Sequence, residues 1–291
     1  MFTLRLHVDV IIFSFFFSIL FCGICVFMDN LLSFWIFLEL CGMSIIPSFF
    51  YSSNSNLHGF YNSLLTYIIM SGLSSILLVS GIIFSSLYIF IFGGFAIKFG
   101  LFPFSLWMYR VFTNSNWYFI FLVSVVSKFP IIIFCFIFQF GGLGLIFLDC
   151  LLTILTCSLF FWLFSQSWEF IWCHISLSSV STLVVACFSS SFEVCLGIYL
   201  YYAFWSVMCI CYFNYLGNYE NSNFMYWVYC FLLLVTPISL PLFYKLGVCF
   251  AILYSSIYVL LAWCVYSFSE QFFLYKVSSD YFYSGVYNSW I

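Results

Sequence analysis

The chain has 291 residues, of which 66% are hydrophobic and 5% are charged, and its six basic and nine acidic side chains give a net charge of −3. A soluble domain carries about a quarter charged residues, so the composition excludes a protein with an ordinary water-facing surface. Six basic residues are also too few for a nucleic-acid-binding patch. The composition predicts a multi-pass membrane protein.

The hydrophobic residues come from a narrow set. Phe occurs 44 times and Cys 14 times, whereas Ala occurs five times. Phe, Cys, Leu, Trp, Tyr, Val and Gly share codons rich in T and G, so this usage indicates drift in a T-rich genome such as an organelle's. The pairs Cys22/Cys25 and Cys209/Cys211 lie inside apolar runs without a histidine nearby, which argues against a metal site. We interpret the cysteines as small buried apolar residues.

Apolar stretches of about 20 residues, the length that crosses a bilayer, recur along the chain. Because lipid requires every backbone polar group to be bonded internally, we expect a single all-α domain over residues 1–271. Residues 272–291 mix aromatic side chains with Ser, Asp and Lys, which predicts an interfacial C-terminal tail. The ten predicted spans cover residues 8–28, 31–51, 60–84, 87–109, 117–138, 142–164, 170–190, 194–216, 225–244 and 246–268.

All five prolines of the chain lie near an ionisable residue that falls within or beside a span. We therefore expect two discontinuous helices, one broken around residues 98–103 and one around residues 235–245. Paired broken helices in two halves of a chain are typical of transporters with inverted repeats, which build ion sites at the breaks. The residues expected to make the breaks are Gly100, Pro103, Pro237 and Pro241.

Glu39 lies near the middle of its predicted span. A carboxyl group at that depth is either protonated or paired with an opposite charge, and Lys98 is the natural partner. A switchable ion site and a structural ion pair that fixes helix orientation both fit this pattern.

Lys128 lies about twelve residues into its predicted span, near the middle of the membrane, where a lysine side chain cannot reach the interface fully. Burial favours the neutral amine, as a proton relay requires. Lys245 follows Pro237 and Pro241 near the join between the last two spans, so a relay role and snorkelling to the interface are both open.

His174 lies near the start of its span, close to several serines, and a histidine among hydroxyl groups passes protons near neutral pH. A satisfied helix-end histidine is the alternative. Asp149 lies well inside residues 142–164 and is a minor candidate. Three histidines, so placed, cannot supply the ligands of paired haems or of a copper centre.

Several of these motifs resemble the NADH–ubiquinone oxidoreductase chain 2 family, the mitochondrially encoded, antiporter-like subunits of complex I. Trp35 and Glu39 followed by Ile46-Pro47 resemble its Trp-x-x-x-Glu…Ile-Pro element. The run from Lys98 to Trp107 resembles its Lys-x-Gly-x-x-Pro-Phe…Trp motif. Lys128 before Pro130, Ser178-Ser179-Val180 and Lys245 are similar to further family elements in the same order.

The chain also departs from the family pattern. Trp172 and Cys173 stand where the family has a basic residue before the Ser-Ser element, and Pro241-Leu242 replaces Gly-Phe before the distal lysine. From the resemblance we also expect the family's final span to be absent. The residues that match the family pattern are therefore Glu39, Lys98 and Lys128, whereas the surroundings of Lys245 and His174 depart from it.

The resemblance implies a core membrane-arm subunit of respiratory complex I in the mitochondrial inner membrane, in contact with other membrane-arm subunits and with lipids. Such a subunit translocates protons coupled to electron transfer from NADH to ubiquinone. Glu39 would set the charge of Lys98, Lys128 would relay laterally, and Lys245 would connect to the exit side. NADH, FMN, iron–sulfur clusters and ubiquinone would be bound by other subunits. A stand-alone secondary cation/proton transporter and a non-pumping structural subunit remain the alternatives.

Overall fold

The structure is a computed structural model that describes residues 2–51, 57–84, 88–137, 143–165, 167–216 and 223–282. All regular secondary structure in these ranges is helical, which confirms the predicted all-α membrane fold. The α-helices are α1 Phe2–Cys25, α2 Leu31–Ile45, α3 Leu57–Ile83, α4 Tyr88–Phe99, α5 Leu106–Thr113, α6 Trp117–Ser124, α7 Phe129–Ile137, α8 Leu143–Phe164, α9 Trp168–Ser189, α10 Phe192–Leu216, α11 Asn223–Leu232, α12 Leu240–Ile252 and α13 Ile257–Phe282. Two 3₁₀ helices, η1 Ile46–Tyr51 and η3 Val126–Lys128, complete the set.

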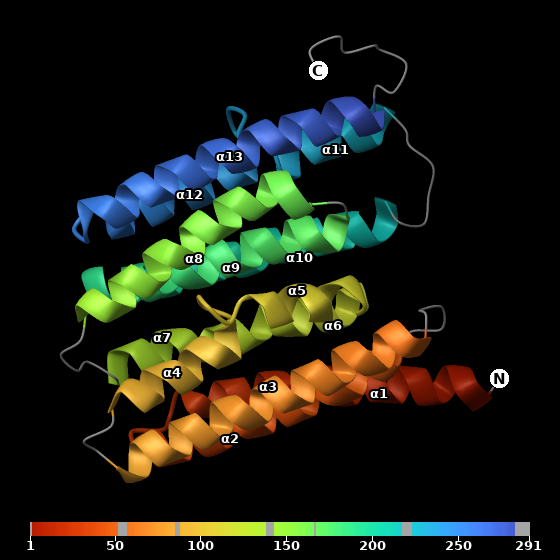
Figure 1. Cartoon of the computed structure of the whole chain (residues 1–291). Helices are drawn as coiled ribbons and strands as arrows, with labels where there is room; N and C mark the ends of the chain where they lie inside the picture. Colours follow the sequence, from red (N-terminus) through yellow and green to blue (C-terminus); the bar gives the residue numbers. More distant parts are fainter. Residues whose placement is uncertain are drawn as a thin grey trace.

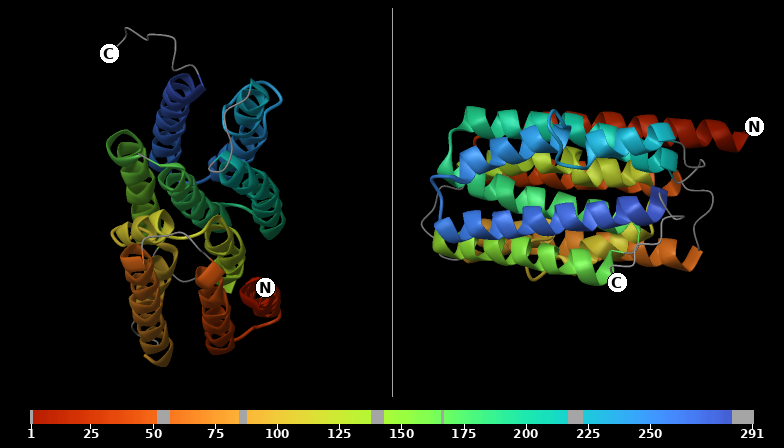
Figure 2. Two further views of the ribbon diagram at one scale, coloured as in Figure 1. Left: turned by 90° about the vertical axis from the view of Figure 1, so that its right-hand side faces the viewer. Right: turned by 90° about the horizontal axis from the view of Figure 1, so that it is seen from above.

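The helices lie side by side with their long axes roughly aligned, as in a membrane bundle (Figure 1). Helices α1 to α3 lie at one end of the bundle, and α11 to α13 lie at the other (Figures 1 and 2). In the described ranges, seven stretches are long and apolar enough to cross a membrane, and three more apolar helices are shorter. Together they make ten apolar segments, the predicted number.

Helix α9 forms the core of the bundle, because 94% of its apolar window is buried, compared with 22% for α3. It packs against α5, α7, α8, α10 and α12. Its centre is nevertheless rich in hydroxyl groups, and each of these donates a hydrogen bond to the carbonyl three residues earlier, at 2.7 to 3.2 Å. Back-bonding of this kind lets Ser and Thr lie in a buried helix without an unsatisfied donor. The residues are Ser176, Ser178, Ser179, Ser181 and Thr182.

The predicted boundaries of the last two spans, 225–244 and 246–268, are wrong. Helix α11 ends at Leu232 and α12 begins only at Leu240, so one discontinuous pass occupies 223–252. Pro237 cannot donate a backbone hydrogen bond, and Ile238 adopts a φ of 73°, which no α-helix contains. The apolar run continues through this irregular segment, which is why the sequence pattern does not reveal it.

The last pass is α13, a continuous helix from Ile257 to Phe282. The predicted tail boundary at residue 272 therefore falls inside this helix. Lys276 and Asp280, which suggested an interfacial tail, lie in the last turns of α13. Residues 283–291 lie outside the described residues.

Candidate functional site

The predicted break around residues 98–103 lies between α4 and α5. Gly100 adopts a φ of +69°, a conformation that glycine enters without steric penalty, and the next helix begins at Leu106. Trp107 Nε1 donates to the Ile97 carbonyl oxygen at 2.9 Å, which connects the start of α5 to the last turn of α4. The break thus ends α4 one residue after Lys98.

Replacing Gly100 with alanine is expected to destabilise the subunit, because the left-handed backbone conformation costs an L-residue about 1–2 kcal/mol. The new Cβ would also lie 2.7 Å from Met108 Cγ. Gly93→Ala is the matched control, since Gly93 lies in the helix that ends just before Gly100 and has no atom within 4 Å of its added Cβ. The thermal unfolding temperature of the detergent-purified protein should fall for Gly100→Ala and hold for Gly93→Ala. Equal temperatures would contradict the assigned role of Gly100.

Lys98 and Glu39 form an ion pair at the end of α4. Lys98 Nζ lies 2.6 Å from Glu39 Oε1 and donates a second hydrogen bond to the Leu38 carbonyl oxygen at 3.3 Å. The side chains are only 13% and 19% exposed. The structure thus brings together the two residues that the sequence pairs by charge, across helices α2 and α4.

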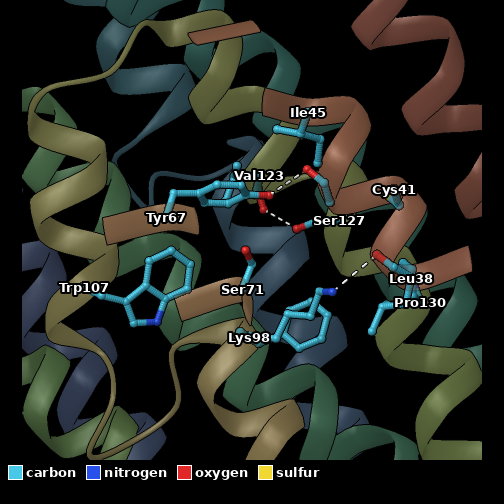
Figure 3. Close-up of a pocket in the computed structure, with 12 residues that line it drawn as sticks. Leu38, Cys41, Ile45, Tyr67, Ser71, Lys98, Trp107, Val123, Ser127 and Pro130 are labelled. Atoms are coloured by element: carbon cyan, nitrogen blue, oxygen red, sulfur yellow. Dashed lines mark hydrogen bonds between the residues drawn. The ribbon is translucent and has the colours of Figure 1, made fainter. Parts of the chain in front are cut away.

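A cavity of about 30 Å³, enough for one or two water molecules, opens beside this pair (Figure 3). Its wall includes Lys98, Tyr67 and Trp107 on one side, and Ser127 with Pro130 on another. Ser127 immediately precedes Lys128 in the chain. The cavity therefore reaches from the break between α4 and α5 to the segment that carries Lys128.

That segment is a second helix break, which the sequence analysis missed. Helix α6 ends at Ser124, and the 3₁₀ helix η3 separates it from α7. At this break the carbonyl oxygens of Ser124 and Val125 accept hydrogen bonds from the hydroxyls of Tyr202 (3.2 Å) and Tyr199 (3.1 Å) on α10, respectively. Lys128 followed by Pro130 is the sequence feature that could have indicated this break. The apolar residues continue on both sides of it, however, so the sequence predicts a single continuous span over residues 117–138.

Lys128 is buried in a cage of neutral hydrogen-bond acceptors. Its side chain is 2% exposed, and Nζ lies 2.7 Å from the Ser176 carbonyl oxygen, 2.6 Å from Ser179 Oγ and 2.8 Å from Tyr202 Oη. Nζ also lies 4.3 Å from the centre of the Tyr202 ring, within cation–π range. None of these three partners is acidic.

The hydrogen bonds of this cage match the charged form of the lysine. Ser179 Oγ already donates to the Ser176 carbonyl, and the Tyr202 hydroxyl donates to the Ser124 carbonyl. Both hydroxyl oxygens therefore accept from Lys128, and with the Ser176 carbonyl they use three N–H donors, the number an ammonium group has. A neutral amine has two donors and would require one hydroxyl hydrogen to turn toward it.

The break that the sequence predicts around residues 235–245 lies at residues 233–239, between α11 and α12. Trp205 Nε1 donates to the Leu232 carbonyl oxygen at 2.7 Å. Gln271 of α13 accepts from the Val235 backbone N–H at 2.8 Å and donates to the Leu233 carbonyl oxygen at 3.4 Å. Side chains of α10 and α13 thus satisfy the backbone groups that this break exposes. Because α12 resumes at Leu240, Lys245 lies within a helix and not at the break.

Lys245 forms an ion pair with Glu270 of α13, a residue the sequence analysis did not single out. Nζ lies 2.6 Å from Glu270 Oε2, and the side chains are 11% and 2% exposed. Glu270 lay just beyond the predicted end of the last span at residue 268. In the structure Glu270 lies at the middle of α13, Ile257–Phe282. A correct span boundary would therefore have revealed a charged residue in the middle of a span, and so a candidate site.

His174 is fully buried on α9, in the core of the bundle and not at a helix end. Its Nδ1 shares a hydrogen bond of 2.8 Å with the Tyr109 hydroxyl of α5, whereas the neighbouring serines bond to backbone carbonyls of their own helix. The hydroxyl group that His174 contacts thus belongs to a tyrosine of another helix and not to the neighbouring serines. Within the described part of the chain, neither His174 Nε2 nor Asp149 Oδ2 has a hydrogen-bond partner.

No protein-family model matches the chain, and no curated protein matches it in sequence. Three solved structures have a similar fold. A chain of respiratory complex I from Thermus thermophilus, with bound aureothin, matches 91% of this chain with a TM-score of 0.75 and 13% identity. A chain of the membrane-bound sulfane sulfur reductase, an archaeal respiratory membrane complex, matches 87% with a TM-score of 0.72 and 13% identity. A chain of the Mrp complex from Dietzia sp. DQ12-45-1b matches 87% with a TM-score of 0.71 and 14% identity.

This chain spans 69%, 62% and 57% of those three chains, in the same order. At such low identity the likeness concerns the fold. The protein is a multi-pass, all-helical membrane protein whose fold is shared with chains of two respiratory complexes and of the Mrp complex.

Proposed function

We propose that this chain is an antiporter-like, proton-translocating subunit of a respiratory complex I. The observation that carries the proposal is the ion pair between Lys98 and Glu39 at a helix break, beside a cavity that reaches the segment of Lys128. Buried charges in a membrane are expensive, and helix breaks that expose them serve as ion sites in transporters. The similar fold of a complex I chain supports the assignment.

In this proposal the Lys98–Glu39 pair is the input switch. A nearby carboxylate stabilises the charged lysine, so separation of the two favours loss of the lysine proton. Each tenfold change in proton affinity corresponds to about 1.4 kcal/mol, which a small movement of one charge in a poorly hydrated site supplies. Water in the cavity beside Lys98 would carry the proton toward Ser127 and Lys128.

Lys128 is the central station of the proposed relay. Its three hydrogen bonds favour the ammonium form, although burial without an acidic partner opposes the charge. Release of its proton would be coupled to rotation of the Ser179 or Tyr202 hydroxyl, which then donates to the neutral amine. Tyr202 faces the C-terminal half of the bundle, where its ring centre lies 5.8 Å from that of Tyr244, the residue before Lys245. Lys245 would then pass the proton toward the exit side.

The proposed setting is the mitochondrial inner membrane, with other membrane-arm subunits and lipids around the chain. The chain would act as part of an H⁺-translocating NADH:ubiquinone reductase, and NADH, FMN, iron–sulfur clusters and ubiquinone would be bound by other subunits. The codon-biased composition supports an organellar gene.

A stand-alone secondary cation/proton transporter is the second candidate, because such transporters also build their ion sites from broken helices and buried charges. Gentle detergent extraction of the tagged full-length chain from its native membrane separates the two. The complex I proposal expects the chain to migrate in a large assembly that oxidises NADH and reduces quinone. A folded chain that migrates alone and exchanges cations for protons in proteoliposomes would overturn it. A non-pumping structural subunit would be found in the assembly but would tolerate loss of its buried lysines.

A further inference from the structure

The pair formed by Lys245 and Glu270 repeats the arrangement of Lys98 and Glu39 in the other half of the bundle. In both pairs Nζ lies 2.6 Å from a glutamate oxygen, the lysine lies on a helix that adjoins a break, and the glutamate comes from a different helix. These are the two lysine–glutamate ion pairs within the described residues. Between them lies Lys128, whose hydrogen-bond partners are neutral.

The distal pair differs from the proximal pair in how the lysine is supported. Lys98 has a backbone carbonyl as a second acceptor, and Lys128 has three acceptors. Lys245 Nζ has no hydrogen-bond acceptor among the described residues apart from its ion-pair contact with Glu270. The charge of Lys245 therefore depends on Glu270 more strongly than the charge of either other lysine depends on a single partner.

Buried tyrosine side chains surround Glu270. It is the more deeply buried member of the pair, at 2% exposed compared with 11% for Lys245. Tyr266 lies one helical turn before it on α13, and both Tyr266 and Tyr244 of α12 are buried and interact electrostatically with Glu270. The ring of Tyr244 packs against the ring of Tyr202, whose hydroxyl accepts a hydrogen bond from Lys128.

We propose that Glu270 is the output switch and terminal proton carrier of the relay, an inference that rests on the proposed function. The N–H bond of the Lys245 ammonium breaks and an O–H bond forms on the Glu270 carboxylate, which leaves a neutral amine and a neutral carboxylic acid. The acid then releases its proton toward the exit side, and the carboxylate returns to stabilise the next ammonium on Lys245. The transfer within the pair creates no net charge, and after the acid has released its proton the pair carries one negative charge until the Lys245 amine takes up the next proton.

The test uses the assembled complex in sealed native membrane vesicles that carry Glu270→Gln, Glu270→Asp or Glu193→Gln. Glu193 is the matched control, because it lies exposed in the first turn of α10. Glu270→Gln should lower proton translocation about 100-fold or more, as loss of a proton-transfer group does. Glu270→Asp should restore part of the activity, and Glu193→Gln should leave it unchanged. Infrared difference spectra during turnover should show a protonated carboxylic acid that is missing in Glu270→Gln.

A purely structural role for the pair is tested by the double variant Lys245→Met with Glu270→Gln, which removes both charges. We expect it to assemble without translocating protons. Wild-type translocation in this double variant, or in Glu270→Gln, would overturn the inference. Lys98→Met tests the proposed function separately. If Lys98→Met does not translocate protons while Glu270→Gln does, the inference about Glu270 is wrong and the proposed function is retained.

Discussion

Replacing Lys98 with methionine is expected to stop proton translocation through this chain and to destabilise the subunit at the same time. The substitution removes the proton-carrying amine, and it leaves Glu39 without its ion-pair partner at a site where the carboxylate is only 19% exposed. Removal of one member of a buried ion pair typically costs about 3–5 kcal/mol. Because both side chains retain some exposure, we expect the lower end of that range. Proton uptake by sealed vesicles and the thermal stability of the complex measure the two effects.

The double variant Glu39→Gln with Lys98→Met separates the two effects, since it removes both charges. Stability should largely recover, because no uncompensated charge is left. Proton translocation and the coupled reduction of quinone should stay low. If the double variant translocates protons at the wild-type rate, the pair is a structural element that fixes α2 against α4.

Replacing Lys128 with methionine should also cause a large loss of proton translocation but, unlike Lys98→Met, little loss of stability. Ser179 and Tyr202 retain their bonds to the backbone carbonyls of Ser176 and Ser124 when the lysine is gone. No charge is left unpaired, because the hydrogen-bond partners of Lys128 are neutral. Proton translocation should fall about 100-fold or more, the contribution typical of a positioned proton-transfer group.

Lys276→Met is the matched control for Lys128→Met, because Lys276 is exposed near the end of α13. It should translocate protons at the wild-type rate. A Lys128→Met complex that assembles and retains full proton translocation would remove Lys128 from the relay. The comparison of unfolding temperatures also tests the cage, since a large drop would show that Lys128 holds α7 against α9 and α10.

The features that the sequence predicts well are those with a local signature. Gly100 and Pro103 lie within five residues of Lys98, so the break and its cation are visible in one short run. Glu39 stands out because it is the one charge in an apolar stretch of bilayer length. The pairing of the two then follows from the cost of a lone charge in lipid.

The features that the sequence does not reveal depend on contacts between distant segments. The break between α6 and α7 is stabilised by Tyr199 and Tyr202, which lie 74 and 78 residues after the carbonyls they bond. Trp205 and Gln271 play the same part at the break between α11 and α12. In the sequence, Tyr199, Tyr202 and Trp205 cannot be told apart from the many aromatic residues of a biased composition, and only the folded bundle shows which of them bond to a broken helix.

Glu270 was missed for a related reason. The apolar run after Leu232 conceals the irregular segment at 233–239, so the last span is predicted about ten residues too early. The centre of α13, at Glu270, then falls just beyond the predicted end of the span at residue 268. Irregular backbone in a membrane protein need not interrupt hydropathy, because side chains from other helices satisfy its polar groups.

The most direct test of the proton relay compares proton uptake by sealed membranes that carry Lys98→Met, Lys128→Met and the two substitutions together. If the proton passes through both lysines in series, each single variant blocks the whole path. The double variant should then translocate no less than either single variant, and all three should lie far below the wild type. Wild-type proton uptake in both single variants, with the complex assembled, would contradict the account.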